Sequence, residues 1–355
     1  MALFKIKIWQ IVIVILIGIL GYSVSCSHMP EIRNEQGQVV EGSITEMEQI
    51  EVNGTQQWIY IRSHSDENPV LLFLAGGPGG SEIGWTQRYN AELEESYTMV
   101  GWDQRGVAKS WSAMEDWSDV TADTFVDDVI AVSEYLTQRF NTNRIFLAGH
   151  SWGSIIGIMA AHRRPDLYHA YIGIAQQVNS VENDLIGYRM VLEGARREGN
   201  EDLVFELEDN GPPPYTVEET GNYLVLFTRL SRYSPHSPDM VGTNPLWMLT
   251  APEHTLIDRI NLVRAVLAGV NYVYPQLADM DFEETIPQLQ VPVYFITGRY
   301  DYTCVASITE RYFNSLEAPY KQLVWFEDSG HNPCYQEADR FNEFMSSEVI
   351  RWAAQ

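Results

Sequence analysis

The feature that most constrains this chain is the pentapeptide Gly149-His150-Ser151-Trp152-Gly153, which lies between two apolar runs. Residues 144–148 read as a buried strand, and residues 154–161 read as a buried helix. A serine flanked two positions away by glycines, at a strand-to-helix turn, is the pattern of a nucleophile elbow. The turn is so tight that the serine backbone is strained and its neighbours must be small. The segment therefore predicts a serine hydroxyl at the edge of a sheet, above a helix N-terminus.

Composition places the chain among globular proteins and excludes some partners. Its 355 residues are 45% apolar and 12% aromatic, enough for a large core in one domain with an insertion or in two domains. The net charge of −25 argues against nucleic acid and against electrostatic docking on anionic lipid. The acidity leaves two interpretations open, which are solubility and an acidic funnel for cationic substrates.

The N-terminal segment predicts export. Lys5 and Lys7 precede an uncharged, mostly apolar stretch, residues 8–25, and Cys26 follows it. This pattern is typical of a signal sequence, with three outcomes: cleavage after Ser23-Val24-Ser25, lipidation of Cys26, or an uncleaved bilayer-spanning anchor. We expect residues 1–26 to be a signal or membrane anchor. The catalytic body would then be extracytoplasmic and in contact with the membrane only through this segment.

The rest of the chain alternates between strand-like and helix-like patterns. After a polar tether at 27–42, the dipeptide Asn53-Gly54 predicts a hairpin. Apolar runs separated by helical patterns then predict an α/β fold, with a doubly wound, mostly parallel sheet over 43–180 and 287–355. Residues 181–286 show helical patterns and no strand run, which predicts an inserted all-helical cap.

A nucleophilic serine needs a base, and the base needs an orienting acid. In this fold the chain order is serine, acid, histidine, with the last two in loops after late strands. Asp301 follows the strand pattern that begins at Val291, and His331 follows the one that begins at Gln322. Asp328 is a rival acid because it lies three residues before the histidine. His150 is expected to pack or line the pocket, since adjacent side chains at a tight turn diverge.

An oxyanion hole needs two backbone N–H donors. One is expected from Trp152, which follows the serine, and the other from the glycine-rich loop at 75–80, through Gly76 or Gly77. A phosphate-binding loop is the alternative for 75–80. It fails because no Lys-Ser/Thr pair opens the next helix.

Five motifs together resemble the prolyl aminopeptidase (proline iminopeptidase) branch of the α/β-hydrolases, from about residue 45 to the C-terminus. They are Leu74-Ala75-Gly76-Gly77-Pro78-Gly79-Gly80, Trp102-Asp103-Gln104-Arg105-Gly106, Gly149-His150-Ser151-Trp152-Gly153-Ser154, Gly298-Arg299-Tyr300-Asp301 and Ser329-Gly330-His331. The resemblance implies a serine peptidase that removes an N-terminal residue, often proline, without metal, and we expect no cofactor. It makes Ser151 the nucleophile, Asp301 the acid and His331 the base. It also implies that Asp103 and Arg105 brace the loops, which fits a charged pair at a strand end.

Two departures from the family concern substrate choice. The family's histidine at the head of the glycine-rich loop is Ala75 here. Family members hold the substrate amino group with cap glutamates, one directly after a tryptophan, whereas Met248 follows Trp247. The cap is still acidic, with 18 Asp and Glu against 7 Lys and Arg across 181–286. Glu193 and Glu198 are candidates for amine binding, and the alternative is that both simply face solvent.

Cys304 and Cys334 each lie three residues after a proposed triad member. In an exported protein they could form a disulfide between the two loops, and the alternative is two small buried apolar side chains.

The sequence thus predicts two-step acyl transfer on a small-molecule or short-peptide substrate. The rivals are a carboxylesterase or amidase on small molecules, and a non-catalytic surface binding protein that keeps the fold. Haloalkane and epoxide hydrolases in their usual form are excluded, because they need an aspartate at the elbow.

Overall fold

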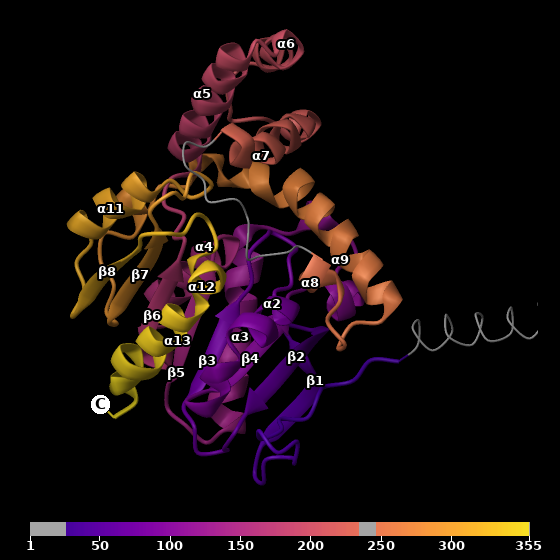
Figure 1. The fold of residues 1–355 in the computed structure, drawn as a ribbon, viewed down its shortest axis with the longest axis vertical. Helices are drawn as coiled ribbons and strands as arrows, with labels where there is room; N and C mark the ends of the chain where they lie inside the picture. The colour runs from indigo at the N-terminus through magenta and orange to yellow at the C-terminus, as the bar shows by residue number, and fades with distance from the viewer. Residues whose placement is uncertain (1–25, 234–245, 355) are drawn as a thin grey trace, which may run out of the picture.

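The computed structural model describes residues 26–233 and 246–354. Within them the core is an eight-stranded sheet with the order β1-β2-β4-β3-β5-β6-β7-β8 (Figure 1). The strands are β1 (Ile44–Val52), β2 (Thr55–Ser63), β3 (Val70–Leu74), β4 (Thr98–Asp103), β5 (Ile145–His150), β6 (Tyr168–Ile174), β7 (Val293–Gly298) and β8 (Lys321–Phe326). Strand β2 is antiparallel to both of its neighbours, and all later pairs are parallel. The predicted α/β class with a mostly parallel sheet is confirmed.

The predicted hairpin forms where Asn53-Gly54 joins the first two strands. Both residues have positive φ, 46° for Asn53 and 77° for Gly54, as a type I′ turn requires. This turn fixes the register, so that Val52 pairs with Thr55 and Ile44 with Ser63.

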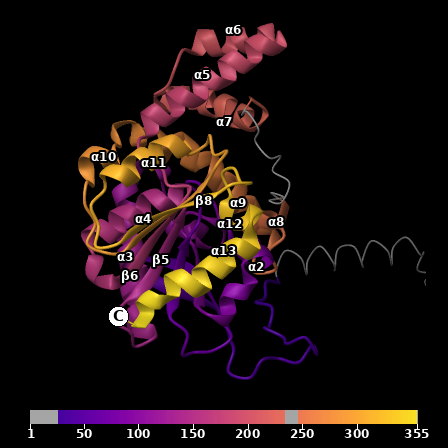
Figure 2. The same cartoon turned by 60° about the vertical axis from the view of Figure 1, so that its left-hand side comes forward.

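The sheet is buried on both faces, and alternate side chains of β3 show why. Leu72 and Leu74 belong to a core cluster that includes Val129 of α3 (Ala122–Arg139) and Ile156 of α4 (Trp152–Arg163). Leu71 and Phe73 belong to a second cluster on the opposite face. That second cluster is closed by Trp85 of α2 (Ile83–Tyr89) and Phe341 of α13 (Ala338–Phe344). Figure 2 shows the two helix layers with the sheet between them.

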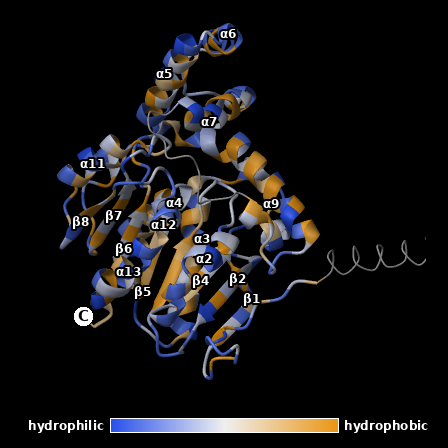
Figure 3. Ribbon diagram, in the orientation of Figure 1, coloured by the Kyte–Doolittle hydropathy of each residue, from blue (hydrophilic) through white to orange (hydrophobic). Residues whose placement is uncertain are grey.

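Helices make up most of the described chain between β6 and β7. They are α5 (Ser180–Glu198), α6 (Glu201–Asn210), α7 (Gly221–Tyr233), α8 (Leu246–Leu249), α9 (Leu256–Ala268) and α10 (Phe282–Thr285). The first three share a small apolar cluster of their own, which includes Val191, Leu207 and Leu226. Figures 1 and 3 show these helices above the carboxyl ends of the strands, with α9 running across them.

The remaining helices follow the last strands. Helix α11 (Ala306–Ser315) joins β7 to β8, and α12 (Pro333–Gln336) precedes α13. The C-terminal helical segment begins with α13, which ends at Phe344 and continues as a π turn (Met345–Val349) and a 3-10 segment (Ile350–Ala354). The wide turn keeps Phe341, Met345 and Val349 together in the core.

The stretch predicted as a tether contacts the body. The N–H of His28 donates to the carbonyl of Pro252 at 3.1 Å, and Ile32 is only 5% exposed. The predicted signal or anchor segment lies outside the described residues, except for Cys26, which is exposed. Among the described residues, no helix has the length and apolar character needed to cross a bilayer.

Candidate active site

The elbow serine sits between β5 and α4 with a backbone that ordinary residues avoid. Ser151 has φ 53° and ψ −116°. A Cβ on Gly149 would lie 2.2 Å from the carbonyl oxygen of Gly153, and one on Gly153 would lie 2.2 Å from that of Leu74. Both glycines are therefore required by backbone contacts, which is the reason for the motif.

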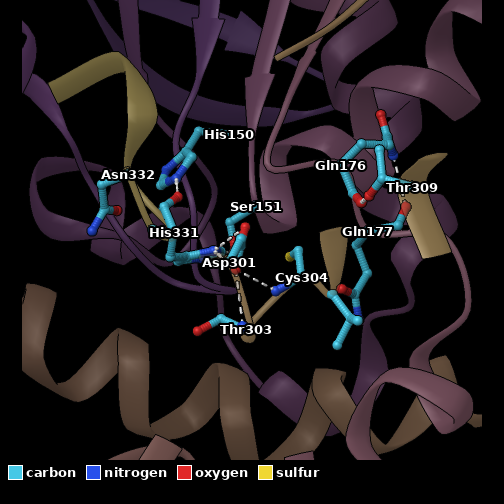
Figure 4. A network of polar contacts seen from close by, with 12 residues as sticks. His150, Ser151, Gln176, Gln177, Asp301, Thr303, Cys304, Thr309, His331 and Asn332 are labelled. Atoms are coloured by element: carbon cyan, nitrogen blue, oxygen red, sulfur yellow. Dashed lines mark hydrogen bonds and ion pairs between the residues drawn. The ribbon is translucent and has the colours of Figure 1, made fainter. Parts of the chain in front are cut away.

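The three side chains predicted to act together do meet (Figure 4). His331 Nε2 lies 3.0 Å from Ser151 Oγ, and His331 Nδ1 lies 3.1 Å from Asp301 Oδ2. Asp301 is 2% exposed, and its Oδ1 accepts hydrogen bonds of 2.9 Å from the N–H groups of Thr303 and Cys304. With Asp301 accepting from Nδ1–H, Nε2 is left to accept the proton of the serine hydroxyl.

The rival acid is not at the histidine. Asp328 is exposed, and its backbone N–H donates to Glu337 Oε1 at 3.1 Å.

A buried ion pair lies next to the group formed by Ser151, His331 and Asp301. Glu82 Oε1 is 2.7 Å from His150 Nδ1, and His150 Nε2 is 2.9 Å from the backbone oxygen of His331. Glu82 Oε1 also accepts the N–H of Gly76, and its Oε2 accepts the hydroxyl of Tyr335 at 2.8 Å. Glu82 thus ties the glycine-rich loop to the loop of the proposed base. It was not identified from the sequence.

The surroundings of His150 hold it in the protonated form. Both ring nitrogens face oxygen acceptors, and only an imidazolium can donate from both. Burial lowers the pKa of His150, but the Glu82 carboxylate, the His331 carbonyl and the Asp301 carboxylate together raise it by more, so that the net change is upward. The predicted role of His150 as a packing or pocket residue therefore becomes a specific one, as the cationic partner of Glu82.

The structure leaves fewer candidate backbone N–H donors for an oxyanion than the sequence suggested. The N–H of Gly76 points at Glu82 at 3.1 Å, so it is already used. Trp152 is the first residue of α4, where a backbone N–H has no partner within the helix. Gly77, at φ 148°, lines the same cavity as Trp152 and Ser151. With the Gly76 N–H engaged, Trp152 and Gly77 are the remaining candidates for the two donors.

A cavity of about 470 Å³ opens above the serine, between the core and the cap. From the cap side its walls are mostly apolar, and they comprise Phe227, Leu230, Met248, Val266, Val270 and Tyr274. Among the described residues, Glu82 is the one carboxylate that lines it.

The proposed amine-binding glutamates are elsewhere, which corrects the prediction for Glu193 and Glu198. Both are exposed on α5, and Glu198 Oε2 pairs with Arg232 at 2.9 Å. The inner side of α5 is occupied by contacts with α7, where a Cβ on Gly194 would lie 2.4 Å from the ring of Tyr233. Glu198 Oε2 also accepts from the Tyr233 hydroxyl of α7 at 3.1 Å, and neither glutamate lines the cavity.

Gln177 offers a polar group that the sequence did not single out. It lines the cavity, is 5% exposed, and its Nε2 donates to Ser180 Oγ at 3.4 Å (Figure 4). Its Oε1 is buried and has no hydrogen-bond partner among the described residues. A buried acceptor left unpaired beside a cavity is costly unless a ligand donates to it.

The cysteines stay apart, so the disulfide interpretation is replaced by the alternative of two buried free thiols. Cys304 lines the same cavity as Ser151. Cys334 lies in the core cluster on the opposite face of the sheet, beside Tyr335. Each thiol packs into its own environment.

Asp301, Cys304 and His331 offer ligand atoms within 4.8 Å of one another, a spacing that a metal ion could use. Burial raises the pKa of the Cys304 thiol well above its ordinary value, so the free thiol carries its proton. The hydrogen bond between Asp301 and His331 suits proton transfer.

We expected Asp103 and Arg105 to form a charged pair with each other, but they do not. Asp103 Oδ2 accepts from the Tyr60 hydroxyl at 2.5 Å and lies 3.0 Å from His254 Nε2, in the loop before α9. Arg105 makes two hydrogen bonds of 2.6 Å to Asp128 of α3. Each braces a different junction, and the first joins the core to the cap.

Comparisons with known proteins identify the family and the fold. Residues 71–344 match the model of a family described as the alpha/beta hydrolase family. The chain is 31% identical over 307 residues to the probable aminopeptidase YbaC of Bacillus subtilis, which covers 86% of this chain and 96% of that protein. It is 22% identical over 315 residues to a proline iminopeptidase of Lactobacillus crispatus, with 87% and 97% covered. The solved structure of a proline iminopeptidase of Mycobacterium smegmatis has a similar fold, with a TM-score of 0.63, 16% identity, and 87% of this chain and 100% of that chain covered.

Proposed function

This chain belongs to the alpha/beta hydrolase family, in its proline iminopeptidase-like branch, and we propose that it is a serine aminopeptidase acting on short peptides. The observation that carries the proposal is the continuous hydrogen-bonded row from Asp301 through His331 to Ser151, at the floor of a cavity that the cap covers.

In the first half of the reaction, Ser151 Oγ attacks the carbonyl carbon of the scissile bond while His331 Nε2 takes the hydroxyl proton. The oxyanion accepts hydrogen bonds from the N–H groups of Trp152 and Gly77. Asp301 holds the imidazole in the required tautomer and stabilises the imidazolium. His331 then gives the proton to the leaving amine, and an acyl-enzyme remains. In the second half, water attacks the ester by the same route, and the acid is released.

Recognition of the substrate's free amino group is assigned to buried acceptors in the cavity wall. Gln177 Oε1 is an unpaired acceptor, and the Glu82 carboxylate lines the same cavity. An N-terminal ammonium that donates to Gln177 would relieve the unsatisfied oxygen. The apolar side chains of α7 and α9 would then surround the first side chain of the peptide. This arrangement suits a substrate that ends in the cavity and so favours cleavage after the first residue.

A second candidate is a carboxylesterase or amidase for small uncharged molecules. It is favoured by the same wall, because the Glu82 carboxylate is already engaged with His150, Gly76 and Tyr335. A cavity with no free carboxylate suits an uncharged acyl group as well as an amine.

Steady-state rates separate the two candidates. The pure protein would be assayed on Pro- and Leu-β-naphthylamide, on the N-acetylated forms of both, and on p-nitrophenyl acetate, with Ser151→Ala as the blank. An aminopeptidase prefers the free amines, and an esterase hydrolyses the acetate with no preference between free and acetylated amides. Failure of a fluorophosphonate probe to label the chain would leave only a non-catalytic binding role.

We also propose that the body is exported and held at a membrane by residues 8–25, whose composition is uncharged and mostly apolar. N-terminal sequencing and mass determination of the protein from membrane and soluble fractions would test this.

A further inference from the structure

The outward face of helix α9 is apolar where a solvent-facing helix is normally charged. Ile257, Ile260, Val263 and Leu267 are 54%, 51%, 48% and 46% exposed. Their spacing of three and four residues places them in one stripe along the helix. Arg264 is the one other exposed residue of α9. A contiguous apolar stripe of this kind marks a surface that is covered by something else.

Exposed side chains on the elements next to α9 are of types that favour a membrane–water boundary. Leu246 and Trp247 are 60% and 36% exposed on α8, which lies beside α9 in both ribbon views (Figures 1 and 2). Tyr272, just beyond the end of α9, is 39% exposed. Tryptophan and tyrosine favour this boundary because each has an apolar ring and a polar tip.

The described chain starts next to this stripe. The hydrogen bond from the His28 N–H to the Pro252 carbonyl fixes the N-terminal stretch four residues before α9 begins. Figure 1 shows the same stretch running from β1 toward the N-terminal end of α9, where that helix begins. The sequence that precedes it, residues 8–25, contains no charged residue and is long enough to span a bilayer. An anchor in the membrane would therefore place the apolar stripe of the body close to the bilayer surface.

We propose that the outward face of α9, defined by Ile257, Ile260, Val263 and Leu267, rests on the surface of the bilayer that holds residues 8–25. This inference rests on the proposed membrane anchor and not on the proposed chemistry.

The charge of the molecule favours a bilayer, and not a second copy of the chain, as the partner that covers this stripe. The net charge of −25 makes two copies repel each other. On the stripe itself the exposed charge is the Arg264 guanidinium, and Asp258 on the same helix is paired with Lys109 at 3.3 Å. The acidity of the molecule is therefore not presented at this face, and an arginine at its edge suits lipid phosphates.

The opposite face of α9 reaches the active site. Val266 lines the cavity, and the backbone of Ala265 packs so closely on the glycine-rich loop that a Cβ on Gly79 would lie 2.3 Å from its oxygen. One helix thus separates the lipid surface from the cavity. This position favours amphipathic substrates that partition into the headgroup region.

The test uses the full chain in phosphatidylcholine vesicles. A Cys26→Ser background leaves Cys304 and Cys334 buried, and a single cysteine is introduced by Ile260→Cys or, as the matched control, by Phe205→Cys. Phe205 is 71% exposed on α6, at the far end of the cap (Figure 1). An environment-sensitive fluorophore is attached to each, and vesicles with and without brominated acyl chains are compared.

We expect brominated lipid to quench the probe at 260 at least two-fold and to leave the probe at 205 unchanged. Equal intensities at 260 in both vesicle types would overturn the proposal. Energy transfer between labelled copies without lipid quenching would instead assign the stripe to self-association. Protection from aqueous iodide without either effect would assign it to residues 8–25 packed against the body. Turnover of a soluble amide by both labelled variants reports on the chemistry separately, so a failure of the proposed function does not alter the outcome.

Discussion

Glu82 and His150 form a buried ion pair, with Glu82 Oε1 2.7 Å from His150 Nδ1 and both side chains nearly inaccessible to solvent. Through this pair, the loop that carries the proposed oxyanion donor Gly77 is joined to the backbone of the proposed base, because His150 Nε2 also reaches the His331 carbonyl oxygen. A single carboxylate therefore sets the distance between two parts of the site that are far apart in sequence.

Removing that charge should disturb catalysis more than binding. In Glu82→Gln the protonated His150 loses its anionic partner, and both loops are free to shift. We expect kcat to fall about 10- to 100-fold with little change in KM, and the unfolding free energy to fall by about 3 kcal/mol. Steady-state kinetics and urea unfolding measure the two effects. Tyr335→Phe is the control, because it removes one hydrogen bond to Glu82 and leaves the ion pair. Unchanged kcat in Glu82→Gln would refute the positioning role.

The nucleophile can be removed without disturbing the fold. Alanine keeps the Cβ that already tolerates φ 53° at residue 151, so Ser151→Ala should change stability by less than about 1 kcal/mol. Turnover should fall by about 10⁴-fold or more, and fluorophosphonate labelling should disappear. Rate measurements together with thermal unfolding check this. A fully active variant would assign the chemistry to another group.

Gln177 separates amine recognition from catalysis. Gln177→Leu removes the unpaired Oε1 while keeping the side-chain volume. We expect KM for free-amine amides to rise about ten-fold, with ester turnover unchanged, and stability to rise by about 1 kcal/mol because the buried orphan acceptor is gone. Gln177→Glu should act in the opposite direction and lower KM for the same amides. Equal effects on amines and esters would show that the residue only shapes the cavity.

The buried carboxyl of Asp184 should make the unfolding free energy decrease as the pH rises. This α5 carboxyl is 3% exposed and accepts a hydrogen bond of 2.9 Å from the Tyr274 hydroxyl. Burial raises the pKa of Asp184 to about 7, although hydrogen bonds from Tyr274 and Asn183 oppose the rise. Because the folded state holds this proton more tightly than the unfolded state, the stabilisation is largest at low pH and is lost as pH rises from about 4 to above 7.

Asp184→Asn tests that sign. The wild-type chain should lose about 2–3 kcal/mol of stability between pH 5 and pH 8.5 from this group, and the variant should not. The advantage of the variant should therefore grow with pH in urea unfolding series. Parallel pH profiles for the two proteins would contradict the assignment.

Much of the fold could be read from local sequence patterns. The Asn53-Gly54 turn, the apolar run at 70–74 and the glycines around Ser151 act through local backbone geometry, so each is visible in a short window. The order serine, acid, histidine then placed Asp301 and His331 in loops at one end of the sheet, where parallel strands bring distant residues together.

The other features of the site depend on how distant elements are oriented in the folded chain, which a local sequence pattern does not show. Glu82 lies six residues beyond Gly76, and only the folding back of that loop points its carboxylate at His150. Glu193 and Glu198 were mispredicted because helical spacing alone does not show that α5 contributes no residue to the cavity wall. The partners of Asp103 and Arg105, His254 and Asp128, lie 151 and 23 residues further along the chain, and nothing in a local pattern announces them.

The thiol of Cys304, which lines the same cavity as Ser151, has a practical consequence for how such a protein is classified. A mercurial small enough to enter would attach a bulky group near the hydroxyl and stop turnover, whereas the larger thiol-reactive fluorophores would not reach this buried sulfur. An inhibitor survey based on mercurials alone would then group this protein with the cysteine hydrolases, although Ser151 is the proposed nucleophile.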